Sequence, residues 1–337
     1  MKKLAAIELA CIIKELQYLE NSKVDKIYQN KKEVIIQLHK AGKILLKIIF
    51  GSSVFITNKK EEIEPTQFCL LLRKHLSQSR LESIKQKDFE RIIELKFKGK
   101  EEHILIIELF GKGNIILCDN DYNIISLLEK QIWKDRKITF NEKYVFPKSP
   151  TPNLFNLTEK ELSNIIKKSK KENIVKILAI DFGLGGTYAE EICLKSDIDK
   201  NAKSVDSKIL FEQIEELRKL NIKPIISDNE AFPFDLETKK NKEYVKTFNE
   251  ALEKTFIPEI KEDKRVKSLK EIADKQKKQI DKLQKDAIKY KMIGDKIYQN
   301  FNTIEEILKG INNNKWKYDH PLIKEKSPKD KKIIIEI

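Results

Sequence analysis

A sevenfold repeat near the C-terminal end constrains the fold of this chain more than any other feature. Mostly apolar residues recur every seven positions from Leu269 to Ile311, and a companion series four residues later runs from Ala273 to Leu308. Such a repeat predicts a long helix with a coiled-coil seam, because residues seven apart share one helix face. Residues 258–337 are therefore predicted to be a coiled-coil segment that pairs with a second copy or with another partner helix. Asn312–Asn314 should end the helix.

Little sequence remains beyond this helix, and it contains one predicted strand, from Lys332 to Ile337. Because an apolar strand coincides with the end of the sequence, we expect the sequence to be a piece of a longer protein. The outer positions of the long helix are rich in lysine. These lysines fit a solvated helix as well as contact with a polyanion, so they do not decide between the two.

The first 150 residues alternate short apolar runs with turn signals. Residues 4–19 repeat apolar side chains at helical spacing and predict an amphipathic helix. Strands are predicted between the turns, at Lys23–Gln29, Glu33–Leu38, Lys43–Ile49, Ser53–Thr57, Arg91–Phe97, Ile104–Leu109, Asn114–Cys118 and Ile124–Leu128. The pattern predicts an α+β fold whose N-terminal domain, residues 1–150, is an antiparallel β-sandwich with two helices.

The segment from Pro65 to Phe97 carries a dense group of candidate binding residues. It predicts a helix that begins at Pro65, then a basic turn, then a strand. The last helical turn holds Arg73, Lys74 and His75, Arg80 follows, and Glu90-Arg91 precedes the strand. Cations beside a carboxylate–guanidinium pair suit a phosphate-rich partner. On these residues alone, capping of the helix dipole and a solvated charged turn explain the pattern better than a binding site does.

Helical patterns dominate residues 151–257, which follow a boundary at Pro147, Pro150 and Pro152. Thr158, with Glu161 three residues later, predicts a capped helix start. A glycine-rich turn, Gly183–Gly186, is predicted between two helices, with Tyr188 in the second. Gly183, Gly185 and Gly186 would let backbone N–H groups approach a phosphate, but a plain helix–helix connection has the same requirement.

The charge is high and unevenly distributed. The net charge is +14 at pH 7. Residues 1–150 carry 28 lysines and arginines against 20 acidic residues, and residues 264–337 carry 20 against 11, whereas the middle of the chain is slightly acidic. Two basic modules suit a polyanion such as RNA. A general lysine bias of the source proteome would produce the same excess.

The four cysteines and four histidines are scattered, without a CxxC pair. We therefore expect buried thiols in a reducing cytosol, no disulfide, no metal cluster and no cofactor. Glu8 interrupts the first apolar stretch, so a signal-peptide pattern is missing, and no apolar run approaches the length of a membrane span. The sequence predicts a cytoplasmic protein without membrane contact.

The same segment also resembles the signature of a known family. Leu72–Leu76 reads LRKHL, and Arg80, Gln86 and Glu90-Arg91 follow. This order is similar to the motif of the NEMF/RqcH family of ribosome-associated quality-control factors, also described as fibronectin-binding-like proteins. Further blocks in the family's order cover nearly the whole chain: Gly111–Ile125, Trp133–Arg136, Tyr144–Pro147, Leu184–Asn201, Phe232–Leu236 and Thr247–Phe256.

The resemblance implies a fold and a function. The N-terminal domain would be related to the N-terminal part of formamidopyrimidine-type DNA glycosylases, and Gly183–Gly186 would be a helix-hairpin-helix turn. Members of the family bind a large ribosomal subunit that still carries peptidyl-tRNA, and recruit tRNA for template-independent addition of C-terminal tails. The implied partners are large-subunit rRNA, tRNA and peptidyl-tRNA. The ribosome makes the peptide bond, so the chain would have no catalytic residue of its own.

The resemblance also implies which residues contact RNA. The family's Asp-Arg pair falls on Glu90 and Arg91, and a second acidic position falls on Glu8; both acids are one methylene longer than the Asp of many members. With the residues of the matched blocks, the candidate tRNA- and RNA-binding set is Glu8, Arg73, Lys74, His75, Arg80, Gln86, Glu90, Arg91, Lys112 and Arg136.

A nucleic-acid-processing enzyme of the glycosylase fold is the alternative. That chemistry uses a proline amine at the mature N-terminus followed by an acid, whereas Met1 is followed here by Lys2 and Lys3. A cysteine set for the DNA-binding zinc finger is also missing. An adhesion or scaffold protein is a third interpretation, which the expected cytoplasmic location disfavours.

Overall fold

The computed structural model describes residues 3–30, 33–59, 64–133, 136–149, 151–203, 205–257, 264–314 and 316–336. The chain forms two compact units, Met1–Glu259 and Ile260–Ile337. None of the helices in these ranges is long and apolar enough to cross a membrane. Pro150 of the predicted boundary and the middle of the Trp133–Arg136 block lie outside the described residues.

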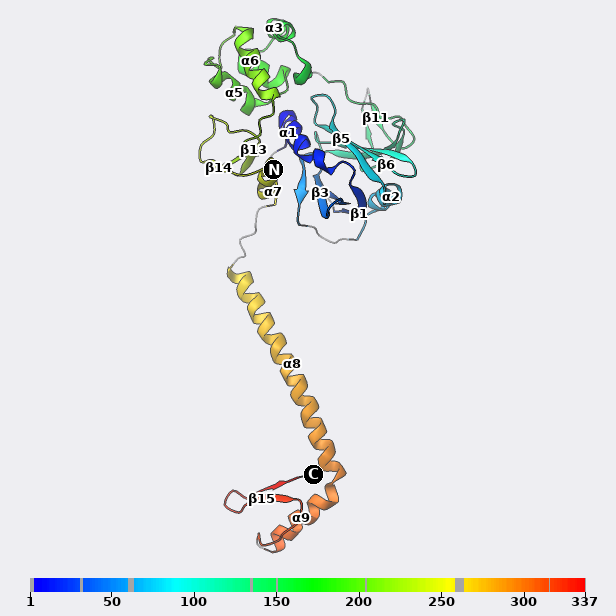
Figure 1. The fold of residues 1–337 in the computed structure, drawn as a ribbon, viewed down its shortest axis with the longest axis vertical. Coiled ribbons are helices and arrows are strands. Elements are labelled where there is room, and N and C mark those ends of the chain that lie inside the picture. Colours follow the sequence, from blue (N-terminus) through cyan, green and yellow to red (C-terminus); the bar gives the residue numbers. More distant parts are fainter. Residues whose placement is uncertain are drawn as a thin grey trace. The chain divides into compact units, whose positions relative to one another are not determined.

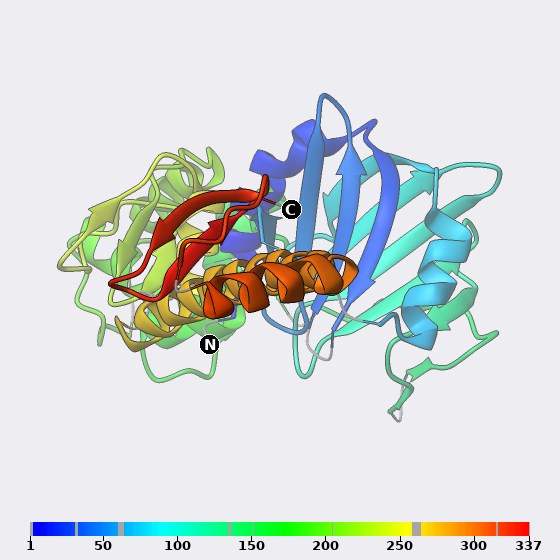
Figure 2. The same ribbon diagram turned by 90° about the horizontal axis from the view of Figure 1, so that it is seen from below.

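A nine-stranded antiparallel sheet forms the N-terminal part of the first unit (Figures 1 and 2). Its strand order is β4-β3-β2-β1-β5-β6-β7-β8-β9. The strands are β1 (Lys23–Gln29), β2 (Glu33–His39), β3 (Lys43–Ile49), β4 (Ser53–Thr57), β5 (Arg80–Gln86), β6 (Ile92–Lys98), β7 (Glu102–Glu108), β8 (Asn114–Asp119) and β9 (Ile124–Leu127). The prediction of an α+β fold with a large antiparallel sheet is confirmed.

The sheet consists of two halves that share one core. β1 and β5 join the halves: Lys23 pairs with Arg80, and backbone hydrogen bonds such as that from Leu81 N–H to the Ser22 carbonyl extend the junction. Apolar side chains from both halves, such as Ile36 and Leu95, meet in the same buried cluster. The helix α1 (Ala6–Leu16) contacts β4 and β5, and α2 (Gln67–Leu76) contacts β1 and β9 (Figure 2). Each helix therefore contacts one strand from each half of the sheet.

The segment between α2 and β6 differs from the prediction. A basic turn was expected there, whereas the structure contains the strand β5. A bulge between Leu81 and Ser83 interrupts the pairing of β5 with β6. It places Leu81 and Ile84 in the core although they are three positions apart, a spacing that hides the strand's alternation of apolar and polar residues.

Helices dominate the part of the first unit that follows. They are η2 (Leu154–Asn156), α3 (Glu159–Lys168), α4 (Ile174–Lys176), the π-helical turn η3 (Ile177–Asp181), α5 (Gly186–Lys195) and α6 (Ser207–Arg218). The predicted capping box is confirmed, since Thr158 accepts from the Glu161 N–H and the Glu161 carboxylate accepts from the Thr158 N–H. Two small antiparallel sheets complete the unit, β10 (Gln131–Ile132) with β11 (Lys137–Ile138), and β12 (Ile225–Ser227) with β13 (Glu230–Phe232) and β14 (Glu243–Tyr244).

The first unit closes with α7 (Phe248–Phe256), which packs on the N-terminal sheet. The Glu15 carboxylate of α1 accepts the N–H groups of Phe248 and Asn249 at 2.8 and 2.9 Å. The Asn249 side chain pairs with the backbone N–H and carbonyl of Ile56 in β4. Helix α7 therefore satisfies backbone groups of a strand at the sheet edge, where unpaired groups invite aggregation.

The second unit begins with the long helix. The predicted helix is present in two pieces, α8 (Lys264–Gln299) and α9 (Phe301–Asn313), which meet at Asn300. The side chain of Leu269 lies outside the described residues. The prediction of a single strand after the helix is wrong, because β15 (Ile323–Ser327) pairs with β16 (Lys332–Ile335). The sequence of β15, IKEKS, is mostly polar and gave no strand signal.

Candidate functional site

The turn between β5 and β6 brings three of the predicted site residues together. The Gln86 amide donates to the backbone carbonyls of Glu90 and Ala6, both at 2.9 Å. One bond holds the turn closed and the other fixes it to the first residue of α1. Phe89, in the same turn, is buried among residues of the helical part and contacts the Phe155 ring with centroids 5.7 Å apart. The turn thus lies where the sheet meets the helices.

Glu90 and Arg91, the two adjacent positions of the family motif, do not form an ion pair with each other. The Glu90 carboxylate accepts a hydrogen bond from the Ser149 hydroxyl instead. The Arg91 side chain, which is half-buried, forms no hydrogen bond or ion pair with any residue that the structure describes. Ser149 was missed, because nothing in the sequence indicates a contact between residues 59 positions apart.

Arg91 differs in this respect from the other arginines whose side chains are described. Arg73 donates through Nε to the Ile27 carbonyl at 2.7 Å, and Arg80 donates to the Asn21 carbonyl at 3.0 Å. Arg218 donates to the carbonyls of Leu154 and Leu157. A guanidinium has five N–H donors in a planar fork, so the Arg91 group retains its full capacity for an external carboxylate or phosphate.

Glu8 is placed differently from a residue that contacts RNA. Its side chain is fully buried at the start of α1. One carboxylate oxygen accepts from the Ala5 N–H at 2.8 Å, and the other accepts from the Tyr188 hydroxyl of α5, also at 2.8 Å. Burial and the neighbouring Glu8 carboxylate raise the pKa of Tyr188 well above its usual value. Glu8 therefore joins α1, which packs on the N-terminal sheet, to the helix α5. A tRNA could contact Glu8 directly only if this buried side chain became exposed.

The basic end of α2 lies apart from this turn, on the side of the sheet near β1 and β9. Lys74 is exposed, whereas the Arg73 guanidinium stacks over the Tyr28 ring at 5.9 Å. Two of the histidines that are scattered in the sequence meet in the fold, because His75 Nδ1 lies 3.1 Å from His103 Nε2. Arg73, Lys74 and His75 thus form one group, and Glu90 with Arg91 belongs to another.

Lys112 lies at the tip of a tight turn between β7 and β8. Its side chain is exposed, and its neighbours Gly111 and Gly113 have φ values of +58° and +81°. A Cβ on Gly113 would stand 2.0 Å from the backbone nitrogen of Gly51, so the two turns touch through their glycines. This packing holds Lys112 outward, where it is accessible to a charged partner.

The Arg136 side chain is bound to other residues of the protein. Its guanidinium forms an ion pair with Glu108, and its Nε donates to the Val145 carbonyl at 2.7 Å. It also lies 5.0 Å from the centre of the Tyr144 ring, and the Tyr144 hydroxyl donates to Glu108 at 2.8 Å. Burial and the Glu108 carboxylate raise the pKa of Tyr144. These contacts indicate a structural role for Arg136.

The predicted glycine-rich turn joins η3 to α5. Gly183 and Gly185 have φ values of +68° and +77°, which favour glycine at both positions. A Cβ on Gly185 or Gly186 would meet nothing within 4 Å, so the N-terminus of α5 is open there. Tyr188 is buried and bonded to Glu8. The helix–turn–helix is present, and its assignment as a helix-hairpin-helix nucleic-acid motif stays a prediction.

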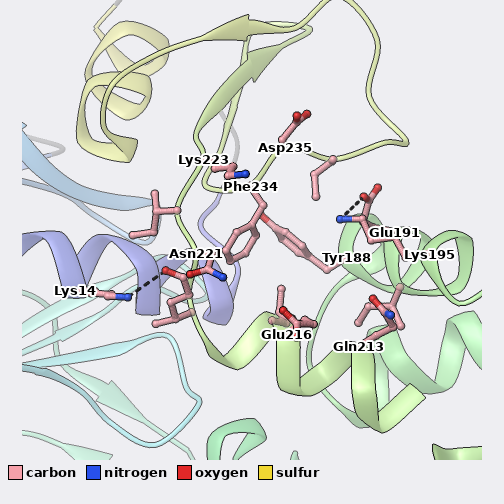
Figure 3. A pocket seen from close by; sticks show the side chains of 15 residues that line it. Lys14, Tyr188, Glu191, Lys195, Gln213, Glu216, Asn221, Lys223, Phe234 and Asp235 are labelled. Carbon is pink, nitrogen blue, oxygen red and sulfur yellow. Dashed lines mark hydrogen bonds and ion pairs between the residues drawn. The ribbon is translucent and has the colours of Figure 1, made fainter. Parts of the chain in front are cut away.

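A cavity of about 720 Å³ lies between α1, α5, α6 and the loop after β13 (Figure 3). Its acidic groups are already engaged. Burial acts to raise the pKa of Glu191, but N–H groups of Thr238 and Glu237 outweigh it and hold the pKa below its usual value. A hydrogen bond from Lys242 lowers the pKa of Asp235. Hydrogen bonds within the protein thus already occupy the carboxylates of both residues.

Comparison with known proteins assigns the chain to a family. The family model described as NFACT N-terminal and middle domains matches residues 6–326. The "Archaeal Rqc2 homolog aRqcH" of Methanocaldococcus jannaschii is 32% identical, over 94% of this chain and 53% of that protein. The "Ribosome quality control complex subunit NEMF" of Mus musculus is 29% identical, over 64% of this chain and 21% of that protein. The chain thus spans about half the length of the first relative and less of the second.

Solved structures agree on the fold. A fibrinogen-binding protein from Staphylococcus aureus superimposes with a TM-score of 0.66 over 75% of this chain and 98% of that one, at 22% identity. The N-terminal part of a fibronectin/fibrinogen-binding protein from Streptococcus suis superimposes with a TM-score of 0.65 over 75% of this chain and 99% of that one. At this identity the likeness concerns the fold alone. The family match covers most of the chain, and the chain belongs to the NEMF/RqcH family.

Proposed function

We propose that this chain is a ribosome-associated quality-control factor that binds large ribosomal subunits carrying peptidyl-tRNA and helps to recruit tRNA for template-independent tailing. It acts as a positioning factor, and the ribosome performs the chemistry. Relatives named as subunits of the ribosome quality control complex support the general role. The partners that we propose for this chain are large-subunit rRNA, tRNA and peptidyl-tRNA.

One observation carries the assignment of the tRNA contact. Arg91 occupies the arginine position of the family motif, and its guanidinium has no partner among the described residues, whereas Gln86 holds the turn beneath it in place. The closed turn fixes the backbone that carries Arg91, and a bidentate contact of its guanidinium with phosphate adds geometric specificity.

Other exposed positive groups extend the proposed RNA contact. Lys74 lies at the end of α2 and Lys112 in the turn between β7 and β8, and both side chains are exposed. Separately, the open N-terminus of α5 offers backbone N–H groups that favour an anion. Contacts of this kind are largely to phosphate, so the binding should weaken steeply as salt is raised.

The test is to identify the RNA that crosslinks to the intact chain after mild irradiation in cells. We expect large-subunit rRNA together with a restricted set of tRNAs. The Arg91→Ala variant should lose mainly the tRNA, and Lys43→Ala, which removes an exposed charge elsewhere on the sheet, should lose neither. Recovery of duplex DNA would favour the glycosylase-like alternative, and recovery of small-subunit rRNA alone would contradict the proposal.

A further inference from the structure

We propose that His75, Glu101 and His103 form a binding site for a zinc ion. The three side chains come from two places in the N-terminal sheet and its helices, the end of α2 and the start of β7. His75 belongs to the last turn of α2, His103 to the start of β7, and Glu101 to the turn that leads into β7. One ligand atom from each of the three residues lies within 4.8 Å of the other two. This proposal does not depend on the proposed RNA contact.

The distance between the two imidazoles fits a shared metal. His75 Nδ1 and His103 Nε2 are 3.1 Å apart. Two nitrogens bound to zinc at tetrahedral angles, each about 2.0–2.1 Å from the ion, stand about 3.3 Å apart, so a small movement admits the ion between them. The carboxylate of Glu101 is 3.8 Å from His103 Nε2. The resulting set of two histidines and one glutamate leaves a fourth position of the shell to water.

The surroundings combine one rigid ligand with one mobile ligand. The His103 side chain is 5% exposed and fixed in the sheet, whereas the Glu101 side chain is 80% exposed and free to rotate towards the ion. The His75 side chain is half-buried at the end of α2 and stands between these two extremes. The Lys74 charge opposes a cation, and Glu101 offsets it.

The simpler alternative is a hydrogen bond in which one imidazole donates to the other. It uses the same two nitrogens and needs no Glu101. The alternatives therefore differ in the role of the glutamate, because only the metal site requires a carboxylate ligand. A bound ion would join the end of α2 to β7 and fix the helix end that carries Arg73 and Lys74.

The experiment uses the untagged full chain, freed of metal by a chelator, and titrates it with zinc by calorimetry. Cobalt serves as a second probe, because its visible absorption reports tetrahedral coordination. We expect one zinc per chain, displacement of cobalt by zinc, and a rise in melting temperature with added zinc. The His75→Ala and Glu101→Gln variants should each bind zinc roughly 10-fold more weakly or worse.

His39→Ala is the matched control, because His39 is exposed at the end of β2 and has no place in the cluster. It should bind zinc as the wild type does. Glu101→Gln changes one exposed side chain, so its result does not depend on whether a histidine variant folds. Unchanged zinc affinity in Glu101→Gln, an equal loss in His39→Ala, or no zinc binding by the wild-type chain would each overturn the proposal.

Discussion

At the scale of single residues, all but one of the arginines whose side chains are described form hydrogen bonds within the protein, and the remaining one is available to bind an external group. Arg91 is the available one, on a turn that Gln86 fixes to the start of α1. Arg136, from the same predicted set, is 9% exposed and paired with a glutamate that is 2% exposed. Replacing Arg91 should therefore weaken binding, whereas replacing Arg136 should lower stability.

Arg91→Ala should weaken tRNA binding by about 1.5–3 kcal/mol, the usual value of a hydrogen bond to a charged group. The melting temperature should stay nearly unchanged, because the guanidinium has no partner among the described residues. Filter binding and thermal melting of the intact chain measure the two quantities. Lys43→Ala controls for the loss of one charge. Unfolding of the Arg91 variant would instead identify Arg91 as a structural cation.

Arg136→Ala should destabilise the first unit by about 3–5 kcal/mol, because it leaves the buried Glu108 carboxylate without its cation. Unfolding in urea, followed by circular dichroism, gives the free energy. The neighbouring Lys137→Ala removes an exposed charge and should cost less than about 0.5 kcal/mol. A stable Arg136→Ala chain with weakened RNA binding would return Arg136 to the RNA-binding set.

Contacts between distant residues are what the sequence could not predict at this scale. Glu8 and Tyr188 are 180 positions apart, and nothing in either local pattern indicates that a carboxylate and a phenol share a hydrogen bond. His75 and His103 are 28 positions apart and meet only because α2 packs beside the sheet. The family motif identified Arg91 as a candidate tRNA contact. It did not predict that the Glu90 carboxylate binds Ser149 instead of the neighbouring Arg91.

At the scale of elements, local patterns predicted most of the N-terminal sheet. Strands with clear alternation and flanking turns, such as β3 and β8, were predicted at nearly their observed bounds. β5 was missed because its bulge breaks the alternation, and β15 because its residues are mostly polar. Local patterns also could not predict that α7 packs beside β4. The Asn249 side chain binds the β4 backbone, and Glu15 of α1, which is distant in the sequence, accepts from the first residue of α7.

The contact between two glycine turns gives a prediction at this scale. Gly113→Ala should destabilise the first unit by about 2–5 kcal/mol, because a Cβ would stand 2.0 Å from the Gly51 nitrogen and φ is +81°. Gly111→Ala, two residues away, has φ of +58° and open space, and should cost only about 1–2 kcal/mol. Urea unfolding of both variants checks the difference. Equal costs would show that the two turns do not touch in solution.

At the scale of the whole molecule, the second unit carries an uncovered apolar seam. The heptad side chains Leu283, Tyr290 and Ile297 of α8 are 60%, 69% and 44% exposed. Exposed apolar side chains at heptad spacing favour association with another helix. The prediction of a coiled coil is left open by these exposures, since the described residues provide no helix that covers the seam.

We therefore expect the chain to dimerise, or to pair with another chain, through this seam. Light scattering over a range of concentrations should show the mass rise towards that of a dimer. A Leu283→Lys, Ile297→Lys variant should stay monomeric and keep its melting temperature, because both side chains are exposed in the single chain. A wild-type chain that remains monomeric at high concentration would contradict pairing with itself.

The proposed function requires the chain to bind the large ribosomal subunit. Co-sedimentation with purified large subunits, small subunits and whole ribosomes, each at low and high salt, measures this binding. We expect the chain to sediment with large subunits in preference to the other two particles, and high salt should release it because the contacts are largely to phosphate. Equal sedimentation with all three particles, or with none, would rule out the proposed function.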